Sequence, residues 1–565
     1  MYKPELLNSL KGYSGKQFLT DFIAGIIVGI VALPLSIAFA IASGCNPATG
    51  LYTAIIAGFC IAAFGGTRVQ IGGPTGAFTV IIYAIVNNPE LGVAGLATAT
   101  VLAGIILILL GVFKMGGLVK FIPYTIVVGF TAGIAVTIAS GQIGDFFGLK
   151  PDFSNPMMIL GEEYSKMPGD FLPKMIVYIR SLASINWYST IMAVVCLAAI
   201  FVWPKITKKI PGSLIVIILA TVIHLVLKKY FGFETVLIGD RYEIPKGLPT
   251  PSLPSLSLTT IKTVFPTAVS IAVLAAIESL LSAVVADGMI GAKHDSNNEL
   301  IGQGIANILS PLFGGLPATG AIARTATNIN NGGRTPVAGI VHAVVLLLIM
   351  MFFGNYVLYI PMAALAAVLM SVAWNMAGIP AIRKLLKGQR SDIAVLMVTF
   401  LITVFVDLTY AIGIGLILAA FFFIKKIIEL SEVQTGNSTI VTGIKGDGNT
   451  EKIDLPKGVM VYEVEGSLFF GTIRKFEMAT ERSGAECKAI IFRMRNLIYL
   501  DAGGIQALEQ CKAACDRKGI TIILSGIHTQ PYMLCEKTGV ADKIGRENIF
   551  DNISAALERA AELVK

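Results

Sequence analysis

The chain has 565 residues, of which 55% are hydrophobic and only 14% are charged, and its mean hydropathy is +0.75. This composition excludes a soluble protein of this size and predicts the lipid bilayer as the main surroundings of the chain. The net charge of +8 requires no nucleic-acid partner, because positive charge is expected beside membrane spans on their cytoplasmic side.

Apolar blocks of about 17–25 residues, long enough to cross the hydrocarbon core, recur from Asp21 to Leu430. Residues 1–21 are predicted to be a cytoplasmic N-terminal segment, and no cleavable signal peptide is evident in them. A transmembrane transport domain is predicted over 22–430. Its fourteen predicted spans, two of them short, are 22–43, 50–64, 74–87, 91–113, 119–140, 188–203, 211–228, 264–288, 297–311, 319–329, 336–353, 359–376, 391–408 and 410–430.

The loops between these spans differ in charge. Loops after even-numbered spans carry Lys and Arg, whereas the short loops after odd-numbered spans have almost none. Positive charge marks the cytoplasmic side, so the even loops and both termini are predicted to be cytoplasmic. The residues concerned are Arg68, Lys114, Lys120, Lys205, Lys208, Lys209, Lys293, Arg334, Arg383, Lys384, Lys387 and Arg390.

The tripeptide Thr-Gly-Ala opens both short spans, as GGPTGA at 72–77 and as GGLPATGA at 314–321. The two copies lie about equally far into the halves 22–228 and 264–430. Seven spans per half bring the second half into the membrane in the opposite sense, so we predict an inverted repeat with two half-helices facing each other at its centre. The alternative is two unrelated Pro/Gly kinks, which are common in membrane helices.

The predicted centre suits an anion, because a helix N-terminus offers unpaired amides and partial positive charge. Thr75 adds a hydroxyl, and Thr319 either does the same or caps its helix. Arg324 follows the second copy by one turn. Arg324 could raise the electrostatic potential of the pocket, bind the substrate or neutralise an acidic side chain, and the sequence leaves these three roles open.

Glu278 is the only acid well inside a predicted span, within IAVLAAIESLLSAVVA at 271–286. A charge at this depth is costly, so such residues usually mark an ion or proton pathway. Ser282, one turn further on, is predicted to share its face of the helix. The alternative is a purely structural Glu278 that pairs with an arginine, for which Arg324 is the natural partner.

After Leu430 the charge returns to the density of a soluble protein. A linker is predicted over 431–454 and a small α/β domain over 455–565, because strands alternate with helices. The predicted strands are 458–464, 488–493 and 520–524, and the predicted helices are 505–518, 530–538 and 553–564. The seven cysteines lack metal-ligand spacing, and no catalytic motif or phosphate loop is present, so we predict neither an enzyme nor a metal or other cofactor.

Four motifs resemble the SulP anion transporters, the solute carrier 26 family: ALPLSIAFAIASG at 32–44, GPTG at 73–76, ESLLSAVVAD at 278–287 and FGGLPATGAIART at 313–325. The resemblance covers nearly the whole chain. It implies a membrane all-α fold of fourteen segments in a seven-plus-seven inverted repeat. A gate domain (segments 5–7 and 12–14) would move against a core domain. It also implies a cytoplasmic α/β STAS domain at the C-terminus and a homodimer.

The resemblance also implies site residues. Those for the substrate are Phe39, Thr75, Gly76, Gly320, Ala321 and Arg324, and those for the coupling ion are Glu278 and Ser282. Members with Asp at the position of Glu278 resemble sodium-coupled transporters, and a sodium-type member can offer Thr where this chain has Ile322. Proton coupling is therefore favoured over sodium.

The leading hypothesis is a proton-coupled symporter of a small inorganic or carboxylate anion, such as bicarbonate, sulfate or a small carboxylate, in the cytoplasmic membrane. The alternatives are a sodium-coupled bicarbonate symporter and an uncoupled anion exchanger or channel. A uracil/xanthine permease has a related fold but usually lacks a STAS domain.

Signalling STAS domains carry a phosphorylated Ser after the Asp of the loop that resembles 500–504. Ala502 stands there in this chain, which excludes phosphorylation at this site. The domain is therefore predicted to be a folding, dimer or regulatory module that could bind a cytoplasmic protein.

Overall fold

The computed structural model describes residues 2–117, 123–207, 211–245, 247, 249–254, 257–406, 408–436, 439–442, 451–469, 472–473 and 487–565. The chain forms two compact units, Met1–Ile417 and Leu418–Lys565, which are described separately. Three residues of the predicted charge pattern (Lys120, Lys208 and Lys209) and parts of the predicted linker (437–438 and 443–450) lie outside the described residues.

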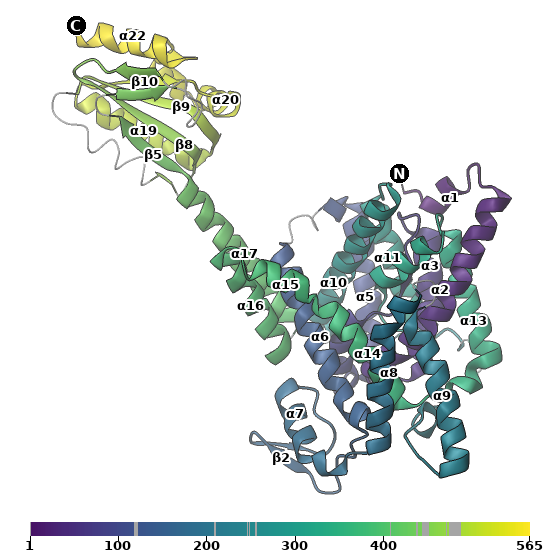
Figure 1. The fold of residues 1–565 in the computed structure, drawn as a ribbon. Coiled ribbons are helices and arrows are strands. Elements are labelled where there is room, and N and C mark those ends of the chain that lie inside the picture. Colours follow the sequence, from purple (N-terminus) through teal and green to yellow (C-terminus); the bar gives the residue numbers. More distant parts are fainter. Residues whose placement is uncertain are drawn as a thin grey trace. The chain divides into compact units, whose positions relative to one another are not determined.

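Each of the fourteen predicted spans corresponds to a helix in the described part of the chain (Figure 1). The helices are α2 (Gly15–Ala42), α3 (Pro47–Phe64), α4 (Thr79–Val86), α5 (Gly92–Val112), α6 (Tyr124–Phe147), α8 (Trp187–Ile206), α9 (Gly212–Phe231), α10 (Leu258–Ile290), α11 (Ser296–Leu312), α12 (Ile322–Asn330), α13 (Val337–Val357), α14 (Met362–Ala377), α16 (Arg390–Phe405) and α17 (Leu408–Leu430). Ten helical stretches in the described residues are long and apolar enough to cross a membrane, with α14 counted together with α15 (Ile379–Leu385). The third and tenth segments are short, as predicted.

Local signals set the ends of several of these helices. Ser14 accepts a hydrogen bond from the amide of Gln17 and so caps the start of α2. The helix begins before the predicted span at 22–43, because its first turns are polar and carry no hydropathy signal. Asn46 caps α3 in the same way. Gly148 ends α6 in the left-handed conformation, which a residue without a β-carbon adopts most easily.

The helix contacts of the first unit follow the repeat. α2 packs on α13 as α10 packs on α5, and α3 packs on α13 as α11 packs on α5. In each comparison, a helix of one half is replaced by the helix seven segments away in the other half, so the packing is that of the predicted repeat. α5 and α11 approach closely, because a β-carbon on either Gly104 or Gly304 would press on the backbone of the other helix.

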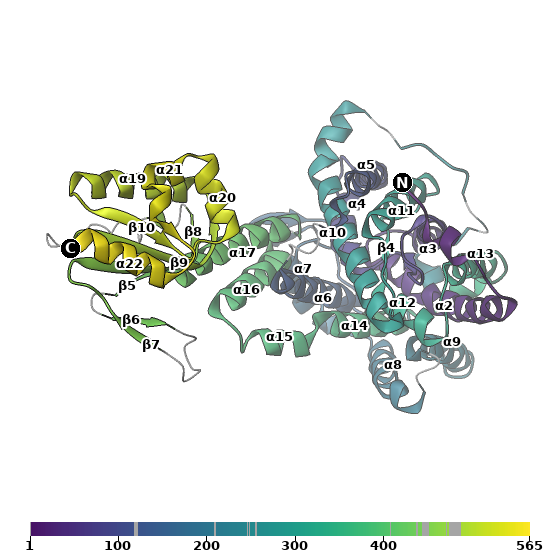
Figure 2. The same ribbon diagram turned by 90° about the horizontal axis from the view of Figure 1, so that it is seen from above.

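A second group of helices repeats in the same way. α6 packs on α14, and α16 packs on α6 as α8 packs on α14. Figure 2 shows α6, α14 and α16 beside the helices that surround β4 (Thr319–Gly320). The two groups correspond to the predicted gate and core domains. The long loop after α6 holds the strands β2 (Met157–Ile159) and β3 (Glu162–Tyr164) and the helix α7 (Phe171–Arg180).

The second unit contains a five-stranded sheet in the order β11-β10-β9-β8-β5. β8 (Val459–Leu468), β9 (Ala489–Leu500), β10 (Thr521–Ser525) and β11 (Ile549–Phe550) run parallel, and β5 (Glu432–Gly436), which falls within the predicted linker, pairs antiparallel with β8.

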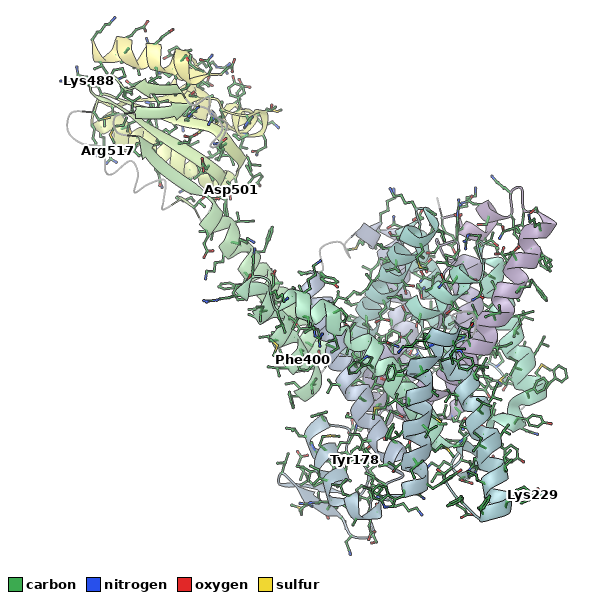
Figure 3. The ribbon with its side chains drawn as sticks, viewed as in Figure 1. Tyr178, Lys229, Phe400, Lys488, Asp501 and Arg517 are labelled. Atoms are coloured by element: carbon green, nitrogen blue, oxygen red, sulfur yellow. The ribbon has the colours of Figure 1, made fainter. Side chains whose placement is uncertain are left out.

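Alternate strand residues enter two separate cores, so helices cover both faces of this sheet. The helices are α19 (Ala502–Arg517), α20 (Thr529–Lys537), α21 (Val540–Ile544) and α22 (Ile553–Val564). Asp501, labelled in Figure 3, caps α19 through the amide of Gly504. This is the predicted α/β domain.

Candidate functional site

The two broken segments meet in the middle of the first unit. β1 (Gly72–Gly73) pairs antiparallel with β4, so that Gly72 lies opposite Gly320 and Gly73 opposite Thr319. Directly after these strands, the short helix η1 (Gly76–Phe78) leads into α4, and α12 begins at Ile322. The unpaired first amides of both helices are therefore brought to one place.

Two glycines make this approach possible. Gly73 has a φ of +150°, and a β-carbon there would collide with the guanidinium of Arg324. A β-carbon on Gly320 would collide with the buried side chain of Gln70. Both amide atoms of Gln70 lack a hydrogen-bond partner among the described residues. Gln70 is a polar residue of the site that carried no sequence signal, because it lies in the loop before the first motif.

The two threonines of the repeated tripeptide have different roles. The Oγ1 atom of Thr75 is buried and has no hydrogen-bond partner among the described residues, and it does not cap η1. The Oγ1 atom of Thr319 lies 2.6 Å from the Oγ atom of Ser279, and α12 is preceded by Ala321 rather than by Thr319. Thr75 thus has a free hydroxyl, whereas Thr319 is used within the protein and does not cap its helix.

Arg324 joins the two halves. It is 2% exposed, and its Nη2 atom donates to the Pro74 carbonyl at 3.0 Å and to the Ser36 hydroxyl at 3.4 Å. Its Nη1 atom has no partner, and no carboxylate within the described ranges forms an ion pair with it. A buried cation without a counter-ion is unfavourable, so this junction would be stabilised by an anion.

Glu278 is not the partner of Arg324. It lines a small cavity of about 60 Å³ where α10 meets α6, α12 and the first turns of α17. The other residues that line it are Ile126, Val127, Phe130, Thr131, Leu274, Ile277, Leu281, Ile322 and Ile412. In the part of the chain that the structure describes, Glu278 forms no ion pair, so the purely structural Glu–Arg pair is not found.

Glu299 on α11 provides a contrast. This glutamate is fully buried, and its carboxylate accepts hydrogen bonds from the Gly66 amide at 2.9 Å, the Thr67 hydroxyl at 2.8 Å and the Gln303 amide at 2.8 Å. Three donors satisfy Glu299, whereas no described donor reaches Glu278. The two glutamates therefore differ in kind: Glu299 is fully buried and hydrogen-bonded, whereas Glu278 is half-buried and faces a cavity.

Ser279, not Ser282, makes the strong contacts on α10. The Oγ atom of Ser279 accepts a hydrogen bond from the Gly320 amide at 3.1 Å, in addition to its contact with Thr319. Ser282 reaches only Thr325, at 3.5 Å. Both serines contact the elements around the second broken segment. Ser282 lies one helical turn from Glu278 but does not line the cavity into which Glu278 faces, between α10, α6, α12 and α17.

We expect Ser279→Ala to lower the midpoint of thermal unfolding more than Ser282→Ala does. The first change removes two buried hydrogen bonds and should cost about 1–3 kcal/mol, whereas the 3.5 Å contact of Ser282 is too long to contribute much. Thermal unfolding of the purified chain in detergent, followed by tryptophan fluorescence, would measure both. Equal shifts for the two variants would contradict the assignment.

Side chains from both helix groups cover Gly76. A β-carbon at this position would lie 3.2 Å from Phe39 on α2, 2.9 Å from Ile138 on α6 and 3.1 Å from Met376 on α14. Phe39 is 7% exposed, so it packs inside the protein beside the predicted substrate position. Ile138 and Met376 were not predicted, because single apolar residues in apolar helices carry no signal of their own.

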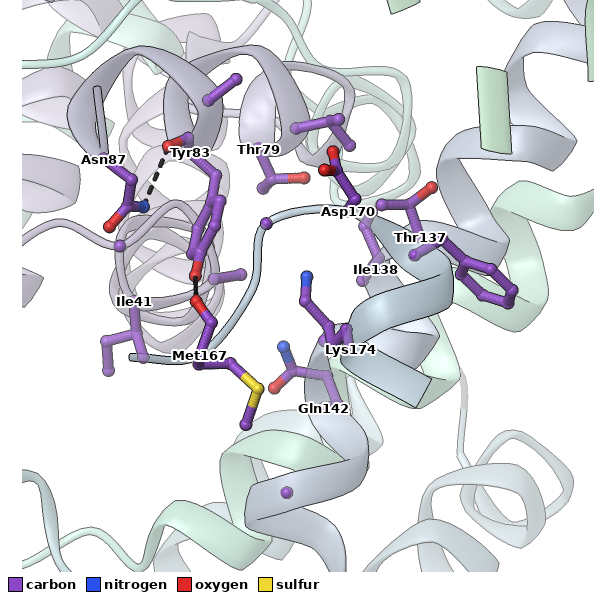
Figure 4. A pocket seen from close by; sticks show the side chains of 18 of the residues that line it. Ile41, Thr79, Tyr83, Asn87, Thr137, Ile138, Gln142, Met167, Asp170 and Lys174 are labelled. Carbon is purple, nitrogen blue, oxygen red and sulfur yellow. Dashed lines mark hydrogen bonds between the residues drawn. The ribbon is translucent and has the colours of Figure 1, made fainter. Parts of the chain in front are cut away.

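A larger cavity of about 630 Å³ begins next to these side chains (Figure 4). It is lined by the C-terminal ends of α2, α6 and α16, by α4 along its length and by residues of α7. Ile138 and Thr79 belong to its wall, and the hydroxyl of Thr79 donates to the Gly76 carbonyl at 2.7 Å. The cavity therefore ends one turn from Thr75, behind Ile138. The charge pattern of the loops predicts that it opens toward the extracytoplasmic side.

The sequence of this chain is similar to those of known proteins. A model of the sulfate permease family matches residues 18–399, and a model of the STAS domain matches residues 452–556. "Putative sulfate transporter YvdB" of Bacillus subtilis (strain 168) is 41% identical over 96% of this chain and 98% of its own length. The bicarbonate transporter BicA of Synechocystis sp. (strain ATCC 27184 / PCC 6803 / Kazusa) is 30% identical over 96% of this chain and 94% of its own length.

Two solved structures are similar to this chain. The murine anion transporter Slc26a9 in its inward-facing state has a TM-score of 0.84 at 22% identity, over 99% of this chain and 94% of its own. This likeness concerns the fold alone. The transmembrane domain of a cyanobacterial bicarbonate transporter BicA has a TM-score of 0.60 at 29% identity, over 72% of this chain and 98% of its own.

Proposed function

This chain belongs to the sulfate permease family, as its four motifs predicted, and we propose that it carries a small anion across the cytoplasmic membrane together with a proton. Membership makes it a multi-pass membrane protein of an anion-transporter family and not an enzyme. The anion and the coupling ion are the parts of the proposal that reach beyond the family.

The observation that carries the proposal is the unpaired positive charge of Arg324 beside two helix N-termini. The guanidinium lies against Gly73 of β1 and donates to the carbonyl of Pro74. The next residue in the chain is Thr75, whose hydroxyl has no partner among the described residues. Backbone amides, a hydroxyl and a guanidinium are donors that suit an oxyanion. We assign substrate binding to Phe39, Thr75, Gly76, Gly320, Ala321 and Arg324, with Gln70 as an added polar neighbour.

The donors of this site fit a small inorganic oxyanion or a small carboxylate. They are few and sit close together, which favours a compact ligand over a large one. Relatives named for sulfate and for bicarbonate each match this chain over 96% of its length, so both anions are first candidates. The site contains no feature that separates them, and a panel of both together with fumarate is the direct test.

Glu278 supports a proton as the coupling ion. Sodium sites in transporters of this general design use several oxygen ligands, including unwound backbone carbonyls. The cavity around Glu278 is instead lined by aliphatic and aromatic side chains and a single hydroxyl, that of Thr131. A carboxyl group in such surroundings can take up and release a proton without any ligand shell. Ser282 then has no direct part in coupling.

Glu278 also lies where movement is expected. Its cavity separates α10 and α12 of the core group from α6 and α17 of the gate group. We propose that the core moves against the gate during transport, so that Glu278 changes its surroundings as the site changes sides. We further propose a homodimer with both termini in the cytoplasm, a transport domain over 22–430, a linker over 431–454 and a STAS domain over 455–565.

We expect anion uptake into proteoliposomes to follow a proton gradient and to be unaffected by sodium. If one proton accompanies one anion, a gradient of one pH unit supports an accumulation of about tenfold. Uptake of labelled sulfate, bicarbonate and fumarate would be measured with the inside more alkaline, with potassium replacing sodium, and with a protonophore. A strict need for sodium would support the sodium alternative, and exchange without accumulation would support an uncoupled exchanger or channel.

A further inference from the structure

A buried lysine lies in the wall of the 630 Å³ cavity, away from the predicted site. Lys174 on α7 is 7% exposed, and its Nζ atom lies 5.0 Å from the centre of the Tyr83 ring on α4. No described carboxylate lies within ion-pair distance of this ammonium group. Its charge is held in place by the face of an aromatic ring but is not neutralised by it.

Gln142 on α6 lies beside Lys174. It is 6% exposed, and its side-chain amide makes no hydrogen bond within the described ranges. Figure 4 shows the ammonium group of Lys174 and the amide of Gln142 pointing into the same space. Two side chains that are more than nine-tenths buried, and that have no hydrogen-bond or ion-pair partner among the described residues, direct their polar ends into one cavity. Their donors are available to a ligand in this cavity.

The other charged groups of the cavity do not neutralise Lys174. Asp145 on α6 pairs with Arg241 at 2.9 Å, so these two charges cancel. Asp170 is exposed to solvent at the start of α7 and forms no ion pair with Lys174. Burial lowers the pKa of Lys174, and the charge of Asp170 only partly opposes this effect. Among the described residues, Lys174 therefore has no close counter-ion.

We propose that Lys174 and Gln142 form an outer binding site for a small oxyanion, which the anion occupies before it passes Ile138 to reach Gly76. The ammonium group supplies charge and the amide supplies a directed donor, so one oxyanion can accept from both. The cavity has room for the ion with part of its water. This inference rests on the proposed anion substrate but not on proton coupling.

The site would act by raising the local anion concentration at the mouth of the transport pathway. Charged clefts with low-dielectric walls increase local ion concentrations and association rates by about 10–10³-fold. The effect should weaken as salt screens the charge. Lys174 is consequently expected to affect the apparent affinity for external anion rather than the maximal rate.

Uptake kinetics in cells that express the full chain test this role. Lys174→Gln should raise the KM for external labelled sulfate or bicarbonate about tenfold with a maximal rate within twofold, and Lys174→Arg should restore most of the affinity. Lys166→Gln is the matched control, because Lys166 is an exposed lysine of the same loop outside the cavity wall. Equal effects of the two glutamine variants, or a lowered maximal rate alone, would overturn the proposal.

A second measurement reads the charge of the cavity without any transport. Thr137 lines the cavity, and all seven native cysteines are buried, so Thr137→Cys provides one reactive thiol. The measured quantity is the rate at which this thiol reacts with an anionic impermeant methanethiosulfonate, divided by its rate with a cationic one. This ratio should fall at least fivefold when Lys174→Gln is added and should not change with Lys166→Gln. External sulfate should slow the anionic reagent only when Lys174 is present. An unchanged ratio would overturn the proposal even if anion uptake itself proved proton-independent.

Discussion

Glu278→Gln is expected to abolish proton-driven anion accumulation while leaving anion exchange in place. Glutamine has nearly the shape of a protonated glutamate, so the apolar cavity around Glu278 should accept it without rearrangement. A side chain that cannot release a proton ends the coupling cycle. Proton flux with the anion should fall to the background of empty liposomes, and counterflow of labelled anion should stay within about threefold of the parent chain.

Glu299→Gln is the matched control for this experiment. The Glu299 carboxylate accepts three hydrogen bonds, and hydrogen bonds to charged groups contribute about 1.5–3 kcal/mol each. We therefore expect this variant to unfold at a lower temperature but to keep its ratio of protons to anions. If Glu278→Gln keeps that ratio as well, Glu278 is not the coupling residue.

Arg324→Gln is expected to remove most of the affinity for the transported anion. Removing one partner of a buried charge interaction typically costs 2–5 kcal/mol, which corresponds to roughly a 30-fold or larger loss of affinity. Lysine keeps the charge, but its single nitrogen cannot both replace Nη2, which contacts Pro74 and Ser36, and offer the free donor of Nη1 to an anion. The affinity of Arg324→Lys should therefore fall between those of Arg324→Gln and the parent chain. Anion-dependent thermal stabilisation and uptake would measure both variants.

Arg68→Gln controls for the loss of a positive charge elsewhere. Arg68 forms an exposed ion pair with Glu5, and such pairs contribute little, so its replacement should leave both affinity and stability nearly unchanged. A folded Arg324→Gln variant with the parent affinity would show that Arg324 only joins the two halves and does not bind substrate.

The membrane segments were predictable because length, apolarity and loop charge are local properties of a sequence. All fourteen were predicted, and the two short ones were placed at the repeated tripeptide. In the five-stranded sheet, β8, β9 and β10 were predicted for the same reason, whereas β5 and β11 were not. Strand β5 exists because β8, far along the chain, lies beside it, and no local pattern reports such a partner.

The site was only partly predictable. Arg324 and the glycines could be named because broken segments are visible in the sequence. The partners of the α10 side chains could not, since neighbouring residues point about 100° apart around the helix axis and the sequence does not show which element packs on each side. In the fold, Glu278 lines a cavity apart from Arg324, and Ser279 rather than Ser282 contacts Gly320. The cover over Gly76 joins residues from three helices, so it became visible only in the fold.

The pairing of β1 with β4 has a consequence for how the protein is made. The strands come from residues 72–73 and 319–320, so the first is synthesised well before its partner exists. Unpaired backbone groups are costly in hydrocarbon, and each is worth several kcal/mol. The first half therefore cannot settle into its final form in the bilayer until the second half has been inserted beside it. The centre of the molecule is then among the last parts to mature during biogenesis.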